Sequence, residues 1–176
     1  DQNAFHGIMQ LQFDNSNTWL LVDIFSKNCI IIDPTRESME RIINFVQCRN
    51  LQVQAILDTH SHADHESSRK NLVRKLNIED NAKDSLGWPS EKNTLNFLSS
   101  YWEVERLETS GHTLDSVCYL VYNKLNKNKL EFAFVGDTIL AGGLGRTDFR
   151  ISGIEQFYET LQLLNKKLTD NTLLCC

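Results

Sequence analysis

The sequence lacks several features that would place it in a particular class. It has no apolar run near the roughly 20 residues that a membrane-crossing helix needs. The net charge is −5, and Lys and Arg are scattered, which argues against a nucleic-acid partner held through phosphate contacts. The first residues, DQNAF, lack the basic region and apolar core of a signal peptide, although a removed targeting segment would leave no trace. These absences predict a cytoplasmic protein without a membrane or nucleic-acid partner.

Paired cysteines are also missing. The five cysteines are odd in number and form no CxxC pair, which favours reduced thiols over a disulfide framework. Cys29, Cys48 and Cys118 lie in apolar patterns, so we expect them in the core.

The length and composition are those of an ordinary globular domain. The chain has 176 residues, of which 41% are hydrophobic and 23% charged. We see no repeats, linkers or low-complexity tracts, so a single domain is predicted over residues 1–176. The sequence leaves the oligomeric state open, and a homodimer is one of the states it allows.

The pattern of apolar residues predicts a run of strands followed by alternating helices and strands, which is typical of a layered α/β fold. Residues 77–93 are predicted to form a loop. The predicted strands are 7–14, 18–25, 28–33, 53–58, 102–108, 116–122, 130–135 and 173–174, and the predicted helices are 36–50, 67–76 and a helix between 154 and 168.

The segment Thr59–His65, THSHADH, contains three histidines and an aspartate within seven residues. Such density invites mutual repulsion unless a cation or a proton relay lies among the side chains. The segment follows the predicted strand 53–58, and α/β sheets place ligands at the carboxyl ends of their strands. We therefore interpret it as part of a metal site.

Two later strands also end in groups that can bind a metal. His112 lies in Gly-His-Thr and Asp137 in Gly-Asp-Thr. Alone, His112 could be a turn residue and Asp137 a cap, but together with the histidine cluster they favour one metal site. Imidazole and carboxylate ligands without a nearby thiol suit zinc or iron(II).

THSHADH, Gly-His-Thr and Gly-Asp-Thr, in this order and at strand ends, resemble the metallo-β-lactamase superfamily. The resemblance implies an αβ/βα sandwich, with two mixed sheets flanked by helices and the metal at one edge. Within the superfamily, Gly145–Phe149 (GRTDF) is similar to the persulfide dioxygenase branch, whereas glyoxalase II enzymes tend to carry Gly-Arg followed by aromatic residues.

The resemblance implies that His60, His112 and Asp137 hold one iron(II), with zinc(II) as the alternative metal. It assigns Arg146 to an anionic substrate such as glutathione persulfide, with dioxygen as the second substrate. A structural ion pair of Arg146 with Asp148 or another acidic residue is the alternative. The remaining motif residues, His62, Asp64 and His65, are expected to surround the iron or to form a partial second site. Asp64 and His65 are also the candidate catalytic residues.

The chain departs from the superfamily pattern in three places. Glu66-Ser67-Ser68 stands where a glycine is usual, and Leu144 stands where a cysteine is usual. The terminal segment with a further histidine is absent, so the fold is expected to lack its C-terminal end and to hold one metal rather than two.

Three functions follow as hypotheses: a mononuclear iron persulfide dioxygenase, a zinc thioester hydrolase of the glyoxalase II kind, and a non-catalytic metal-binding relative.

Overall fold

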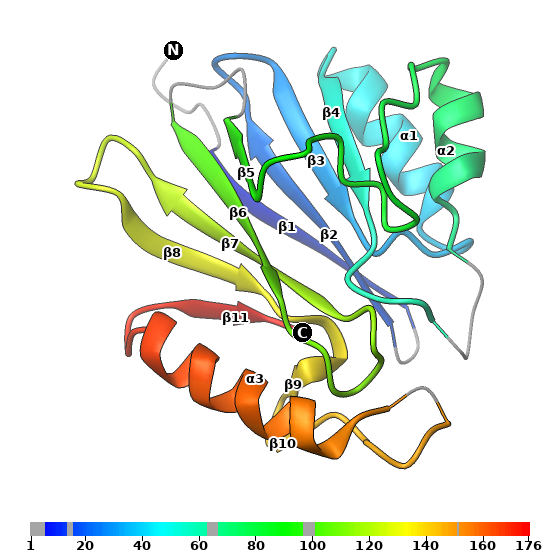
Figure 1. Ribbon diagram of the computed structural model, residues 1–176. Coiled ribbons are helices and arrows are strands. Elements are labelled where there is room, and N and C mark those ends of the chain that lie inside the picture. Colours follow the sequence, from blue (N-terminus) through cyan, green and yellow to red (C-terminus); the bar gives the residue numbers. More distant parts are fainter. Residues whose placement is uncertain (1–5, 14–15, 63–66, 97–100, 151) are drawn as a thin grey trace. The chain divides into compact units, whose positions relative to one another are not determined.

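The computed structural model of the chain (Figure 1) describes residues 6–13, 16–62, 67–96, 101–150 and 152–176. The chain divides into two compact units. Unit 1 contains residues 1–58 and most of 62–100, and unit 2 contains residues 59–61, 92–96 and 101–176. His60 therefore belongs to unit 2 and His62 to unit 1. The prediction of a single domain over 1–176 stays a prediction.

Unit 1 is built on a four-stranded mixed sheet with the order β1-β2-β3-β4. The first two strand pairs are antiparallel, and β3 and β4 run parallel. A parallel pair needs a crossover connection, which α1 supplies. The helices α1 and α2 lie side by side (Figure 1). The elements are β1 (His6–Phe13), β2 (Ser16–Asp23), β3 (Asn28–Ile32), α1 (Met39–Cys48), β4 (Gln52–Leu57) and α2 (Arg69–Leu76).

The core of unit 1 follows from its apolar spacing. All five residues of β3 are buried, as expected for a strand covered on both faces. In α1, Met39, Ile42 and Val46 are buried at helical spacing, and they join one cluster with residues of β2, β3 and β4. This packing fixes the two parallel strands whose carboxyl ends carry the acidic residues described below.

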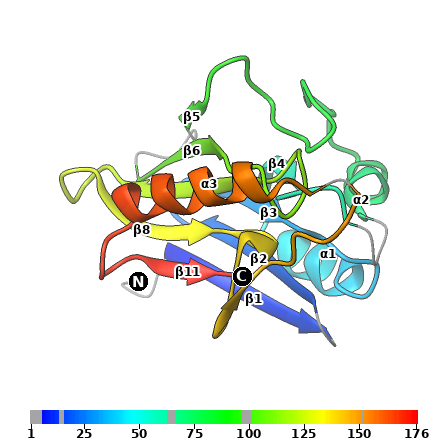
Figure 2. The same ribbon diagram turned by 60° about the horizontal axis from the view of Figure 1, so that its bottom comes forward.

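Unit 2 is built on a five-stranded mixed sheet with the order β11-β8-β7-β6-β5, in which β11 and β8 are parallel and the other pairs antiparallel. Figure 2 shows α3 running across this sheet. Leu164 of α3 joins a buried cluster with residues of β7 and β8. The elements are β5 (Thr94–Asn96), β6 (Trp102–Glu108), β7 (Val117–Asn123), β8 (Lys129–Phe134), the 3-10 turn η1 (Gly136–Thr138), β9 (Ile139–Leu140), β10 (Gly143–Leu144), α3 (Ile154–Lys167) and β11 (Leu173–Cys175).

The predicted elements are present, with shifts at their ends. The first helix begins at Met39 rather than at residue 36, because Thr35 and Ser38 form a hydrogen-bonded turn before it. It ends at Cys48, shortly before Asn50 adopts a left-handed φ of 51°. The strands β5, β9 and β10 were not predicted, since two or three residues are too few to show a period.

The prediction for the cysteines is right at two positions and wrong at one. Cys29 and Cys118 are buried, and burial raises the pKa of the Cys29 thiol to about 12. Cys48 is exposed, because the buried stripe of α1 runs through residues 42 and 46 and leaves position 48 off that face. The five cysteines, all within the described ranges, form no disulfide bond.

Within the described ranges, no helix has both the length and the apolar character needed to cross a membrane.

Candidate metal centre

Three side chains predicted to bind a metal form one group in unit 2. His60 lies in the segment 59–61, His112 in the loop between β6 and β7, and Asp137 in η1 after β8. Each offers one ligand atom, and these atoms all lie within 4.8 Å of one another. His60 and His112 are buried, whereas Asp137 is exposed. The loops thus bring two imidazoles and a carboxylate together with the carboxylate on the solvent side.

Hydrogen bonds decide which nitrogen of His112 can bind a metal. Its Nδ1 lies 2.9 Å from the carbonyl oxygen of Arg146. A carbonyl only accepts hydrogen bonds, so in the neutral imidazole Nδ1 carries the proton and Nε2 has the lone pair. Nε2 lies 3.5 Å from Oδ2 of Asp137. A lone pair and a carboxylate oxygen therefore face one small space, which fits a cation.

His60 is oriented by its neighbours in a similar way. The hydroxyl of Thr59 lies 2.9 Å from Nδ1 of His60. The His60 and His112 rings meet edge to face, with centroids 5.1 Å apart and an interplanar angle of 84°. The two imidazoles are thus held by contacts of their own, and the donor set suits a borderline divalent metal such as iron(II) or zinc.

Two glycines allow the loops of this group to approach one another. A Cβ at Gly145 would lie 1.8 Å from the carbonyl oxygen of Asp137 and 3.2 Å from Nδ1 of His112. Gly136 has a φ of 49°, and a Cβ there would lie 2.3 Å from the Thr59 hydroxyl. Any larger residue at either position would push apart segments that carry ligands.

The side chain of Arg146 forms an ion pair with Asp148. Such a pair is one of the two roles predicted for this residue. Nε and Nη2 donate to the two carboxylate oxygens of Asp148 at 3.0 and 2.9 Å. These contacts raise the pKa of Arg146 and lower the pKa of Asp148. The guanidinium also lies 5.0 Å from the centroid of the Phe149 ring, which in turn contacts His112 edge to face at 5.4 Å. Because the pair is exposed to water, it holds the side chain only weakly.

A second group lies in unit 1 and consists of Asp33, Asp58 and His62. Nε2 of His62 lies 3.3 Å from Oδ1 of Asp33, and the Ser67 hydroxyl donates to Asp58 at 2.8 Å. Burial, and then the charge of Asp33, raise the pKa of Asp58 to about 7. His62, which was predicted to surround the metal or to form a partial second site, is thus grouped with two carboxylates.

Sequence reasoning did not single out Asp33 and Asp58, although a signal was present. Each is the first residue after a strand, and β3 and β4 are parallel neighbours. The carboxyl ends of parallel neighbours meet at the same edge of a sheet. Asp33 also adopts a left-handed φ of 50°, a conformation that often marks functional positions. The predicted catalytic residues Asp64 and His65 lie outside the described residues.

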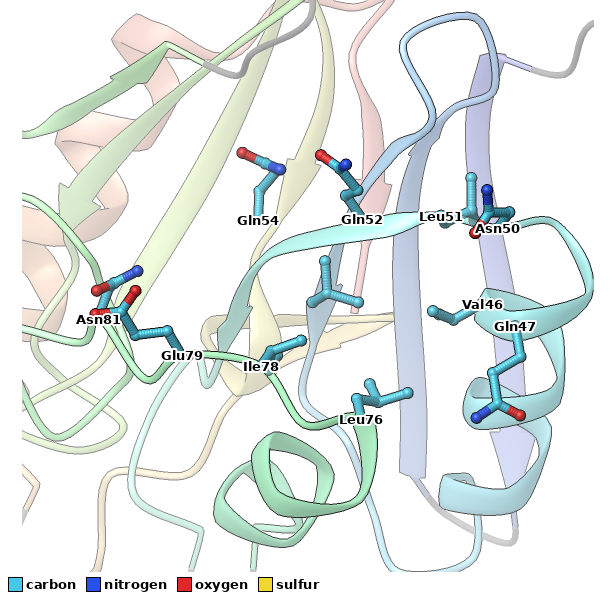
Figure 3. Close-up of a pocket in the computed structure, with 11 residues that line it drawn as sticks. Val46, Gln47, Asn50, Leu51, Gln52, Gln54, Leu76, Ile78, Glu79 and Asn81 are labelled. Carbon is cyan, nitrogen blue, oxygen red and sulfur yellow. The ribbon is translucent and has the colours of Figure 1, made fainter.

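A hollow of about 490 Å³ opens at the amino-terminal end of β4 in unit 1 (Figure 3). Amide side chains such as Gln52, Gln54 and Asn81 surround it, and Val46, Leu76 and Ile78 contribute apolar surface. Among the described residues that line it, Glu79 is the single ionisable group. The hollow therefore offers no acid–base pair or ligand set for chemistry, and the metal-capable groups lie elsewhere.

Comparison with known proteins gives relatives but no matching family model. The chain is 33% identical over 170 residues to the hydroxyacylglutathione hydrolase of Psychromonas ingrahamii, covering 93% of this chain and 61% of the relative's length. It is 28% identical to ETHE1 of Myxococcus xanthus, whose crystal structure matches with a TM-score of 0.77 over 95% of this chain and 73% of that one. A metallo-β-lactamase structure from Staphylococcus aureus matches with a TM-score of 0.78 at 23% identity, over 98% of this chain and 55% of that one.

These matches, together with the mixed four- and five-stranded sheets and the helices α1, α2 and α3 of the described residues, define the class: the chain has the metallo-β-lactamase fold. The superfamily resemblance and the α/β fold class predicted from the sequence are both confirmed. Within this class, the chain is similar both to ETHE1 and to a hydroxyacylglutathione hydrolase.

Proposed function

We propose that the chain is a mononuclear iron(II) persulfide dioxygenase. The reaction converts glutathione persulfide, or a similar small persulfide, with dioxygen and water into sulfite, the thiol and two protons. The outer sulfur gives up four electrons, which dioxygen accepts. The observation that carries the proposal is the group of His60, His112 and Asp137, whose ligand atoms lie within 4.8 Å of one another. A set of two histidines and one carboxylate is typical of non-haem iron(II) oxygenases.

The residues of the group fit such a metal by their chemistry and their hydrogen bonds. When bound there, iron(II) would supply coordination positions and redox chemistry for a persulfide sulfur and dioxygen. The Arg146 carbonyl keeps the proton on Nδ1 of His112, so that Nε2 stays available as a ligand. The side chain of Asp137 is 50% exposed, which leaves this side of the group open to small substrates.

The comparisons support two candidate reactions. Similarity to ETHE1 supports the dioxygenase. The 33% identity to a hydroxyacylglutathione hydrolase supports the second candidate, a zinc-dependent thioester hydrolase. The chain spans 61% of that relative's length, so the substrates of either reaction are part of the proposal.

The experiment is a direct comparison of the two reactions with the same preparation. Iron-loaded protein is given glutathione persulfide in an oxygen electrode, and sulfite is measured in parallel. We expect oxygen uptake and sulfite in a one-to-one ratio, with little cleavage of lactoyl-glutathione by iron- or zinc-loaded protein. Thioester cleavage without oxygen uptake would contradict the dioxygenase and support the hydrolase as the function. Neither activity in folded, metal-loaded protein would favour a non-catalytic relative.

Arg146 is proposed to contact an anionic group of the substrate, since its exposed pair with Asp148 can exchange for a substrate carboxylate. Arg146→Ala should therefore lower kcat/KM roughly ten- to hundredfold, mainly through KM. The matched control is Arg150→Ala, which removes another exposed arginine four positions away. Steady-state kinetics with glutathione persulfide checks this, and equal effects of the two variants would remove Arg146 from the substrate site.

A further inference from the structure

We infer that Asp115 is a positioning residue of the metal centre: its carboxylate fastens the segment that carries His60 to the loop that carries His112. Both segments belong to unit 2. The inference rests on the metal site of the proposed function, but not on which reaction that site performs.

The contacts of Asp115 reach a residue next to each histidine. Oδ1 accepts a hydrogen bond from the main-chain N–H of Ser61 at 3.3 Å and one from the Thr113 hydroxyl at 2.7 Å. Oδ2 accepts a hydrogen bond from the Ser61 hydroxyl. Ser61 directly follows His60, and Thr113 directly follows His112. One carboxylate therefore bridges the neighbours of two predicted metal ligands.

The other neighbour of His60 is held by the first residue of β7, directly after that loop. The main-chain N–H of Val117 donates to the carbonyl oxygen of Thr59 at 2.8 Å. His60 thus lies between two attachments, a main-chain bond at Thr59 and the Asp115 bonds at Ser61. Substitution of Asp115 can remove the second attachment and leave the first in place, which makes the role of the side chain testable.

The hydroxyl groups near Asp115 form a hydrogen-bonded chain in which Thr113 donates to its carboxylate. The Ser116 hydroxyl accepts from the N–H of Thr113 at 3.1 Å and lies 2.7 Å from the Thr113 hydroxyl, which itself donates to Asp115. Burial raises the pKa of Asp115, but the hydrogen bonds from Ser61 and Thr113 outweigh it and leave the pKa below its usual value. Asparagine cannot replace this group fully, because its NH₂ would face a donor where the carboxylate has an acceptor.

Fastening the two loops before the metal arrives lowers the cost of ordering the ligands on binding. Residues that orient metal ligands in this way typically change metal affinity about 10- to 100-fold when they are replaced. We expect an effect of that size for Asp115→Ala, and a smaller one for Asp115→Asn.

The test uses Asp115→Ala, Ser61→Ala, the double variant, and Asp170→Ala as a matched control that removes an exposed aspartate of unit 2. Cobalt(II) is titrated into metal-free protein and followed by its visible absorption. We expect the two single variants to bind cobalt(II) roughly 10- to 100-fold more weakly than the wild type, and the double variant to bind no more weakly than the weaker single variant. Affinities within about twofold of the Asp170→Ala control would overturn the inference.

Hydrogen exchange of the metal-free proteins gives a readout that does not depend on metal or activity. Asp115→Ala should speed exchange in both segments, residues 59–61 and 109–117, whereas faster exchange confined to 113–116 would show that Asp115 orders only its own loop. If the wild type binds no cobalt(II), the proposed metal centre fails, and the exchange measurement still decides whether Asp115 joins the two segments.

Discussion

Replacing His112 with alanine is expected to abolish metal binding, with a loss of affinity of at least about a hundredfold. The variant removes one of three ligands and leaves the Arg146 carbonyl without the imidazole that it orients. Metal content after purification and a cobalt(II) titration measure the loss. His6→Ala is the matched control, because it removes a histidine of β1 that belongs to neither metal-capable group.

The predicted catalytic residue Asp64 provides a second comparison for His112. Asp64→Asn should lower activity more than metal content if Asp64 acts near the metal without binding it. Equal metal loss in His112→Ala and Asp64→Asn would make Asp64 a ligand and shift support toward the zinc hydrolase. Full metal content in His112→Ala would contradict the ligand set itself.

Gly145→Ala is expected to have the second largest effect. The added Cβ would lie 1.8 Å from the carbonyl oxygen of Asp137, a main-chain atom that cannot move alone. Relief of this clash must displace the segment that carries the Arg146 carbonyl, and with it the orientation of His112. We expect a loss of cobalt(II) affinity of about ten- to hundredfold, accompanied by a lower melting temperature.

The matched control for this change is Gly143→Ala in β10, where an added Cβ would meet no atom within 4 Å. This variant should bind cobalt(II) like the wild type. If Gly145→Ala also keeps full affinity, the close passage of its main chain past Asp137 and His112 does not hold the metal group together.

The sequence was sufficient to single out three side chains that the structure brings together, because they share a position as well as a chemistry. His60, His112 and Asp137 each follow a strand, and the two strands before His112 and Asp137, β6 and β8, run in the same direction and end at the same edge of the five-stranded sheet. The helix α1 was likewise predictable from its helical spacing, and the buried strand β3 from its continuous apolar run.

The contacts that orient those ligands could not be predicted in the same way. The bond from His112 to the Arg146 carbonyl uses a main-chain atom that every residue possesses, so no side chain marks it. Asp115 and Ser61 are 54 positions apart, and both are ordinary turn residues in the sequence. Such pairs become visible once the fold brings their segments together.

The central claim is that His60, His112 and Asp137 hold a single metal ion, and metal stoichiometry tests it most directly. Protein is purified without oxygen, desalted, and analysed for iron and zinc per chain, with the His112→Ala variant treated in parallel. We predict close to one iron per wild-type chain and almost none in the variant, because the two histidines and one carboxylate of this group are a typical iron(II) set, whereas the second group offers one histidine and two carboxylates. Two tightly bound zinc ions per chain would contradict the account.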